Sequence, residues 1–391
     1  MLFGISKFSE INEMYGYHFG NRVLQQYARS LFASVGNSGH IYRIDGTKFA
    51  VISTSLSISE LKEGYDGFRS FLHEDFVVDD KAILLDLYCG ALSVEEFGVD
   101  AQTIYACLNY ACTESKIKRQ GDMVEFFSGL NEENHQRLEK LHAIRASIMH
   151  EHKGFYLLYQ PVVDAQTEQL IGAEALLRWK DDRYGVVPPD QFIPILESDP
   201  LFPELGAWII WESVYAAKQM LKLYPDFVMN VNLSYTQLEK ADFVDMVLRI
   251  LNDLEYPADH LCLEVTERCR LLDLDLLKNV LASLKAQGVL IALDDFGTGF
   301  SSVSILKEIP FNIIKIDRSF VQMIEENEID RKIVQNIADL ASIFGAKVCV
   351  EGIETQGMRT ILMSYQVESF QGYYYAKPLM IDNLLVWEKK S

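Results

Sequence analysis

A series of short apolar runs, each ending on an acidic or amide residue, constrains the fold of this 391-residue chain more than any other feature. The residues that end these runs are Glu174, Asn232, Glu264, Asp294 with Asp295, Asp317, Glu351 and Gln371. Amphipathic segments of helical period, such as 276–284 and 333–341, lie between most of them. Apolar strands that alternate with helices predict a parallel α/β sheet. Because polar residues follow many successive strands, the pattern favours a β/α barrel.

The pair Asp294-Asp295 is the most informative of these strand ends. It follows the apolar run 291–293 and precedes a loop with two glycines, Gly297 and Gly299. Two carboxylates about 4 Å apart repel by roughly 4 kcal/mol at an effective dielectric constant of about 20. A divalent cation would turn this repulsion into a binding site. The alternative, a solvated turn, is disfavoured because the same pattern recurs along the chain.

In a β/α barrel, the carboxyl ends of distant strands converge on one mouth. We therefore expect a set of polar residues to share a metal centre there, namely Glu174, Asn232, Glu264, Asp294 and Glu351. The ligand atoms would all be oxygens, with no His or Cys among the residues. Such a set favours Mg²⁺ or Mn²⁺ over Zn²⁺.

Composition limits the partners and the compartment. The formal charge of −20 excludes a nucleic acid polymer, whose binding needs a basic surface, but a small phosphodiester is compatible if metal ions neutralise it. The six cysteines show no paired metal-ligand spacing and most lie in apolar segments, so we expect reduced thiols in a cytoplasmic protein. No apolar run approaches the roughly 18 residues of a membrane span, so we expect no membrane segment.

The polar strand ends lie inside longer motifs that follow one another in order. The motifs read YQP at 159–161, EALLRW at 174–179, NLS at 232–234, EVTE at 264–267, DDFG at 294–297, KID at 315–317, EGIET at 351–355 and QGY at 371–373. Over residues 130–391 this series resembles the EAL-domain cyclic-di-GMP phosphodiesterases. The resemblance implies metal-dependent hydrolysis of cyclic di-GMP to linear 5′-pGpG in second-messenger signalling, on a TIM-like β/α barrel.

The resemblance also implies two Mg²⁺ or Mn²⁺ ions and roles for individual residues. One ion would be held by Glu174, Asn232, Glu264 and Asp294, and the second by Asp294, Asp295 and Glu351. Catalysis would rest on Glu351 as a base and on Lys315, which orients or helps deprotonate the attacking water. The substrate would contact Arg178, Leu177 and Asp317, and Gln371 would contact either the substrate or the attacking water. Glu267 would support the loop 295–302. Through this loop region the family commonly forms homodimers.

Alternatives remain open at several points. The chain could be a non-catalytic receptor for cyclic di-GMP or a protein-interaction module, although every expected ligand is present. Another metal-dependent phosphodiesterase on the same barrel would need a different substrate subsite. Glu174 could form only a salt bridge, and Lys315 could be only the counter-ion of the acids. The chain could also be a monomer in which the segment 301–309 packs on the barrel.

Residues 1–129 predict a second, smaller α/β domain. The runs 49–53 and 82–87 are typical of strands, and 22–31 has the period of an amphipathic helix. With FSEINEMYG at 8–16 and DGTKF at 45–49, this part resembles a degenerate GGDEF (diguanylate cyclase) domain. The family's opening helix is absent, so we expect the domain to be incomplete at its N-terminus. A polar helical segment, 131–144, would join it to the barrel and form the barrel's first helix.

The resemblance implies that this domain has no cyclase activity. Ser6 and Thr47 stand where the family has metal-binding acids, and Lys48 places a cation where another acid belongs. Such a site cannot hold two divalent ions against a triphosphate. Asn12 matches a guanine-contacting position and Asn21 replaces the Asp that usually accompanies it. Weakened GTP binding and a structural or regulatory role are therefore expected.

Overall fold

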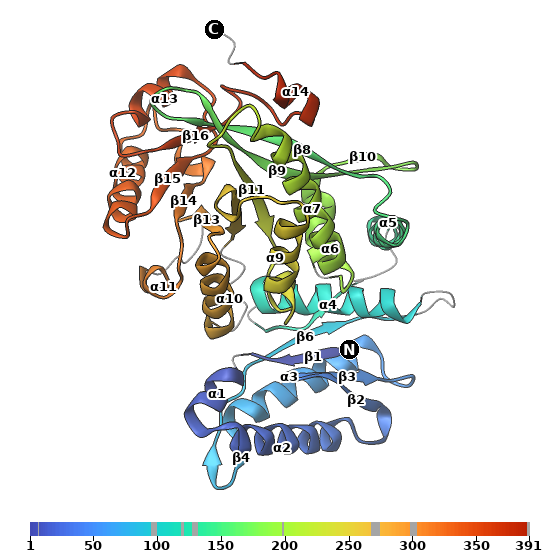
Figure 1. Cartoon of the computed structure of the whole chain (residues 1–391). Coiled ribbons are helices and arrows are strands. Elements are labelled where there is room, and N and C mark those ends of the chain that lie inside the picture. The colour runs from blue at the N-terminus through green and yellow to red at the C-terminus, as the bar shows by residue number, and fades with distance from the viewer. Residues whose placement is uncertain are drawn as a thin grey trace. The chain divides into compact units, whose positions relative to one another are not determined.

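The computed structural model describes residues 1–6, 8–94, 100–118, 121–126, 132–197, 199–266, 274–297 and 303–388. The chain divides into two compact units, which Figure 1 shows in the colours of the chain order. Unit 1 contains Met1–Ala146 and Asp190–Pro200, and unit 2 contains Ser147–Pro189 and Leu201–Ser391. Within the described residues, every helix is too short or too polar to cross a membrane.

Unit 1 is built on a five-stranded sheet with the strand order β2-β3-β1-β6-β7. The strands are β1 (Leu2–Ile5), β2 (His40–Asp45), β3 (Lys48–Ile52), β6 (Leu87–Ala91) and β7 (Val124–Glu125). Only β6 and β7 pair in parallel. A separate hairpin joins β4 (Val77–Val78) to β5 (Lys81–Ala82). The helices are α1 (Phe8–Tyr15), α2 (Tyr17–Val35), α3 (Ile58–Glu74) and α4 (Ala101–Lys118), with most of α5 (Glu132–Met149) and α6 (Pro189–Glu197).

Alternation of side chains along the strands gives this sheet two apolar faces. Phe3 and Cys89 point into a core shared with α2 and α3, whereas their neighbours Leu2 and Tyr88 pack with Cys112 of α4. In Figure 1, α4 accordingly covers one face of the sheet, and α2 and α3 cover the other. The predicted helix 22–31 lies within α2, and the predicted strand 49–53 overlaps β3, so both predictions are confirmed.

The predicted strand 82–87 is wrong for most of its length. Only Ala82, at the end of β5, and Leu87, at the start of β6, belong to strands. Ile83 and Leu85 are buried and Leu84 is exposed, which produces the alternation that resembles a strand in the sequence. Their backbone amides donate to Phe76 O and Leu72 O near the end of α3, and not to a neighbouring strand. The segment is therefore an extended connection whose Ile83 and Leu85 side chains pack into the core of unit 1.

Unit 2 is a closed eight-stranded barrel with the order β9-β11-β12-β13-β14-β15-β16-β8, and β8 pairs back to β9. The strands are β8 (Phe155–Asp164), β9 (Leu170–Asp181), β11 (Val228–Leu233), β12 (Leu261–Val265), β13 (Leu290–Phe296), β14 (Ile313–Ile316), β15 (Lys347–Val350) and β16 (Ser369–Gln371). All neighbours are parallel except β8, which runs antiparallel to both β9 and β16. A short strand, β10 (Gly185–Val187), extends β9 as a hairpin.

Helices follow most barrel strands, so the expected fold class, a TIM-like β/α barrel after a smaller α/β domain, is confirmed. They are α7 (Phe202–Met220), α8 (Tyr235–Leu238), α9 (Phe243–Asp253), α10 (Leu274–Ala286), α11 (Val303–Glu308), α12 (Glu328–Ile343), α13 (Gln356–Leu362) and α14 (Ile381–Leu385). The segments 276–284 and 333–341 lie in α10 and α12, as predicted.

Glu174 does not end its strand, contrary to the sequence-based expectation. It lies in the middle of β9, which continues to Asp181. The cause is β8, which pairs with β9 from Val163↔Leu170 up to Phe155↔Trp179 and so extends the strand beyond the rest of the barrel. Asn232 and Glu264 lie close to the ends of β11 and β12, as expected.

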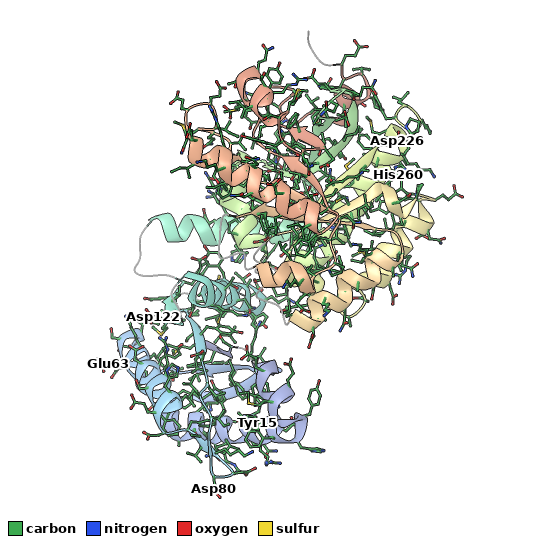
Figure 2. All side chains as sticks on the ribbon, turned by 90° about the vertical axis from the view of Figure 1, so that its left-hand side faces the viewer. Tyr15, Glu63, Asp80, Asp122, Asp226 and His260 are labelled. Atoms are coloured by element: carbon green, nitrogen blue, oxygen red, sulfur yellow. The ribbon has the colours of Figure 1, made fainter. Side chains whose placement is uncertain are left out.

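The two ends of the barrel are chemically different. Asp226 and His260, both labelled in Figure 2, precede β11 and β12 and mark the amino end of the parallel strands. There His260 Nδ1 lies 2.7 Å from Phe227 O, a contact that ties two neighbouring strand starts together. The predicted functional residues stand at the opposite, carboxyl end, where β/α barrels carry their chemistry.

The helix expected at 131–144 corresponds to α5, which begins at Glu132. Asn131 lies outside the described residues. Its Arg145 is buried and donates from Nη1 to Asp199 Oδ2 (2.7 Å) and from Nη2 to Gln102 Oε1 (2.9 Å). This network joins α5, α4 and the segment after α6 within unit 1. The domain division at 129/130 stays a prediction, because unit 1 also includes residues 190–200.

We expect Asp199→Ala to open unit 1 locally, because it leaves the Arg145 guanidinium buried without its carboxylate. Breaking such a pair costs about 3–5 kcal/mol. Hydrogen exchange of the α4 and α5 amides, read by mass spectrometry, should therefore become about 100-fold faster or more. The control is Asp182→Ala, which removes an ion pair to Lys153 whose side chains are 94% and 73% exposed. Equal exchange rates in the two variants would contradict the prediction.

Candidate active site

Lys315, on β14, places a buried ammonium group at the carboxyl end of the barrel. Its Nζ lies 2.5 Å from Glu351 Oε1, 2.7 Å from Glu264 Oε1, 3.4 Å from Glu174 Oε2 and 3.5 Å from Asp294 Oδ1. These acids come from β12, β9 and β13 and from the position directly after β15. The barrel therefore gathers four carboxylates from distant parts of the sequence around one cation, and Lys315 itself is only 2% exposed.

Burial and mutual repulsion shift the proton affinities of these groups. Burial alone would lower the pKa of Lys315, but the surrounding carboxylates raise it well above its usual value. Burial, aided by the neighbouring acids, raises the pKa of Glu264 well above its usual range and that of Glu351 to about 8, although Lys315 opposes both shifts. One ammonium is too little charge for four carboxylates, so protons neutralise part of the cluster.

Glu174 differs from the other acids because two amides hold it. Asn232 Nδ2 donates to Glu174 Oε1 and Gln371 Nε2 donates to Oε2, each at 2.6 Å. Burial raises the pKa of Glu174, but Lys315 and these two hydrogen bonds outweigh burial and lower it below its usual value. Glu174 is therefore the acid of the cluster that the protein keeps charged and fixed in orientation.

A β-bulge in β13 determines where the neighbouring carboxylates of Asp294 and Asp295 lie. The ladder between β13 and β14 shifts register between Leu293 and Phe296, and Asp295 has a φ of 53°. Aspartate tolerates this left-handed conformation better than most residues. The bulge interrupts the alternation of a strand, so both neighbouring carboxylates remain near the mouth. Burial, together with the charges of Asp294 and Asp317, raises the pKa of Asp295 to about 6.

Glycine is required directly after Glu351. Gly352 has a φ of +71°, and a Cβ there would lie 2.3 Å from Arg318 Cβ. The backbone amide of Glu351 donates to Ile316 O at 3.0 Å, and that of Ile353 donates to Gln371 O at 3.1 Å. These bonds fix the segment between β14 and β16, so the Glu351 carboxylate is aimed from a constrained backbone.

The donor set fits a hard divalent cation. Both Glu264 oxygens, Asp294 Oδ1 and Glu351 Oε1 are buried without a hydrogen bond of good geometry among the described residues, although Lys315 lies within ion-pair distance. Oxygen ligands of this kind suit Mg²⁺ and Mn²⁺. Across the described residues, no three His, Cys, Asp or Glu side chains already stand in a metal-ready arrangement. The carboxylates instead face the Lys315 ammonium.

The other predicted site residues are placed as follows. Arg178 lies on β9, partly buried, and its Nη1 donates to Leu177 O at 2.9 Å. Asp317 follows β14, and its Oδ1 accepts from Ser319 N at 2.9 Å. Glu267 and residues 298–302 of the loop lie outside the described residues. The residues that the structure brings together by direct contact are Glu174, Asn232, Glu264, Asp294, Lys315, Glu351 and Gln371.

Sequence reasoning gave no role to Gln160, which is also part of the cluster. It lies on β8, opposite Glu174 in the ladder, and its Oε1 accepts from Gln371 Nε2 at 3.2 Å. Its place in the YQP motif was the available signal. The period-two alternation of β8 could not identify it, because this strand is mostly buried on both faces.

In unit 1, the residues of the degenerate site are engaged with the protein. Lys48 Nζ donates to Asn109 Oδ1 of α4 at 3.4 Å, and Ser6 N donates to Asp86 O at 2.8 Å. The Asn12 side chain lies against Gly20 of α2, where an added Cβ would meet Asn12 Oδ1. The ammonium of Lys48, at the start of β3, is thus bound to α4 of its own unit.

Comparison with known proteins agrees with this geometry. Residues 142–378 match the family model of the EAL domain, and residues 1–122 match that of the diguanylate cyclase GGDEF domain. The chain is 29% identical over 379 residues to the bifunctional diguanylate cyclase/cyclic di-GMP phosphodiesterase MucR of Pseudomonas aeruginosa, covering 97% of this chain and 55% of the relative. It is 27% identical over 392 residues to the oxygen sensor protein DosP of Escherichia coli, covering 99% of this chain and 48% of the relative. The chain spans about half the length of these curated relatives.

Solved structures resemble the barrel as well. The PaMucR phosphodiesterase in complex with c-di-GMP is 34% identical, with a TM-score of 0.59, and the match covers 63% of this chain and 99% of that one. The EAL enzyme Bd1971, in its form bound to cAMP and cyclic-di-GMP, is 30% identical, with a TM-score of 0.61 and coverage of 65% and 69%. Since the EAL model matches more than half of the chain and the barrel carries the motif acids at its carboxyl end, this protein belongs to the EAL domain family and has a GGDEF domain ahead of its barrel.

Proposed function

We propose that this protein hydrolyses cyclic di-GMP to linear 5′-pGpG in second-messenger signalling. The observation that carries the proposal is the cluster of four carboxylates around Lys315, with Glu174 held by two amides. The cluster provides the charge needed to bind metal ions beside a phosphodiester. The similarity to a phosphodiesterase solved in complex with c-di-GMP supports this choice of substrate.

The proposed cofactors are two Mg²⁺ or Mn²⁺ ions. One would be held by Glu174, Asn232, Glu264 and Asp294, and the other by Asp294, Asp295 and Glu351. Such ions neutralise the charge of the phosphodiester and make water more acidic. The oxygen-only donors support this assignment, as do the buried carboxylate oxygens of Glu264 and Asp294, which have Lys315 nearby but no hydrogen bond among the described residues.

The side chains supply orientation and proton transfer. Lys315 donates hydrogen bonds only, so it can hold a water or phosphate oxygen close to the acids. Once the bound ions had displaced its proton, the Glu351 carboxylate could take a proton from the attacking water, as a base must. Arg178 would pair with a substrate phosphate through its planar fork. Leu177 and Asp317 would contact the dinucleotide, Gln371 would contact the dinucleotide or the attacking water, and Glu267 would support the loop 295–302.

We further propose that residues 1–129 form a domain without cyclase activity that regulates or supports a barrel domain of residues 130–391. The Lys48–Asn109 contact supports this view, because an ammonium stands where the reaction needs an acid. Weak GTP binding through Asn12, a cytoplasmic location and a homodimer complete the proposal. Of the predicted dimer segment, Leu306 and Ile309 are buried in the protein, so a dimer would use other residues near the loop.

The direct test is turnover of cyclic di-GMP with Mg²⁺ or Mn²⁺, followed by chromatography. We expect linear 5′-pGpG from the wild type, and a kcat at least about 100-fold lower for Glu174→Gln, which keeps the shape but not the charge of the acid. The control is Glu255→Gln, in an exposed turn. Tight binding of cyclic di-GMP by the wild type without any product would favour the receptor alternative instead.

Metal affinity should rise with pH. Below about pH 8 the Glu351 carboxyl carries a proton, which a cation must displace, and above it the carboxylate is free to bind. Calorimetric titration with Mn²⁺ at pH 7 in buffers of different ionisation heats should therefore show proton release. Glu351→Gln should release fewer protons and bind with a flatter pH dependence. Equal proton release by the two proteins would contradict the assignment of Glu351 as a ligand.

The N-terminal domain should make no cyclic di-GMP from GTP. The measurement uses a Glu351→Ala background, in which any product would persist, and added cyclic di-GMP serves as the control for persistence. Ser6, Thr47 and Lys48 lack the carboxylates that two divalent ions require, which is the reason for the expected absence. Accumulation of product from GTP would refute the prediction, whereas binding of GTP alone would agree with it.

A further inference from the structure

Gln160 and Gln371 lie on neighbouring strands beside Glu174. β8 stands between β9 and β16, with Gln160 opposite Glu174 in one ladder and Gln371 opposite Val162 in the other. Both glutamines are buried, at 9% and 4% exposure. Buried carboxamides adopt the orientation that their hydrogen-bond partners impose, because unmatched donors and acceptors are costly there.

The partners of these amides allow a single orientation of each. Gln160 Nε2 donates to Ala376 O (3.3 Å), and Gln371 Nε2 donates to both Gln160 Oε1 (3.2 Å) and Glu174 Oε2 (2.6 Å). The two ends of this chain, a backbone carbonyl and a carboxylate, can only accept. Turning either amide over would place one oxygen against another, so the chain of contacts assigns both orientations.

The orientation leaves one acceptor for the site. Both N–H groups of Gln371 are used, and its Oε1 is buried without a hydrogen-bond partner among the described residues. Oε1 is bonded to the same carbon as Nε2, so it lies within about 5 Å of Glu174 Oε2. A buried, unpaired acceptor beside the carboxylate cluster indicates that a ligand with an O–H or N–H group completes it.

We propose that Gln160 is a positioning residue, which holds the Gln371 amide so that its Oε1 faces the water that attacks the phosphodiester. The proposal rests on the proposed function. Gln371 Oε1 accepts one hydrogen of this water, which turns a lone pair of the water oxygen toward phosphorus. The oxygen bonds to phosphorus and the P–O3′ bond breaks. One proton of the water passes to the base and then to the released 3′ oxygen, and the other stays on the new 5′-phosphate. Gln160 itself exchanges no proton.

Without Gln160, only the bond to Glu174 Oε2 still holds the Gln371 carboxamide, which can rotate about that bond so that its second N–H, and not Oε1, faces the site. An N–H donor would bind the lone pair that the attack requires, and would turn the water the wrong way. We therefore expect Gln160→Met, which keeps the shape but not the hydrogen bonds, to lower kcat by about 10-fold or more. The KM for cyclic di-GMP should stay within about twofold, because Gln160 acts through Gln371 and not on the substrate.

The double variant separates the two explanations. If Gln160 acts through Gln371, then Gln160→Met should cause no further loss of kcat in a Gln371→Met background. The matched control is Gln335→Met, on the exposed side of α12, which should leave both constants unchanged. Losses that multiply in the double variant, or a raised KM with an unchanged kcat, would mean that Gln160 meets the substrate directly and would overturn the proposal.

A second measurement does not depend on activity. In protein labelled with ¹⁵N-glutamine, the side-chain amide signals of Gln371 are identified by their absence from Gln371→Met. Gln160→Met should shift these signals and make their exchange with water about 10-fold faster or more, whereas Gln335→Met should not. Unchanged Gln371 signals would overturn the positioning role even if the wild type is active. A wild type without turnover but with the expected shifts would refute the proposed function, and with it the role in attack, but not the Gln160–Gln371 contact.

Discussion

The buried ammonium of Lys315 is the interaction on which the site depends. Four carboxylates converge at the carboxyl end of the barrel, and at an effective dielectric constant of about 20 each close pair repels by roughly 4 kcal/mol. One cation cannot offset this repulsion, and the raised pKa values of Glu264 and Glu351 show where protons take up the remainder. A divalent ion would compete with these protons for the same oxygens, so its affinity for the cluster would depend on pH.

The side-chain amides around Glu174 fix the orientation of its carboxylate. Asn232 and Gln371 donate to its two oxygens, so this acid keeps a single orientation although it also lies near the lysine. β8 makes the arrangement possible, because it brings Gln160 between the strands that carry Glu174 and Gln371. An all-parallel barrel would place a strand of opposite direction there, with different residues at its mouth. The reversal of one strand thus supports the chemistry of its neighbours.

Much of the fold followed from the sequence, and the failures have physical causes. The alternation of apolar runs and helical segments predicted the barrel, and the repeated polar ends predicted which residues gather at its mouth. The end of β9 was misplaced because strand pairing with β8, a long-range contact, extends it to Asp181. The segment 82–87 has the period of a strand, but its backbone bonds to α3, so periodicity alone could not exclude the wrong partner. The role of Gln160 depends on hydrogen-bond directions, which a sequence does not record.

The antiparallel course of β8 also determines where the polypeptide enters the barrel. Phe155 pairs with Trp179 and Tyr156 pairs with Arg178, so β8 begins at the end of the barrel that holds the carboxylates. Just before it, Gly154 O accepts from Lys180 N at 2.9 Å. In a barrel whose first strand was parallel to the others, the chain would arrive at the far end. Here the incoming segment is anchored two residues from Arg178, so the chain enters the barrel at the same end as the carboxylate cluster.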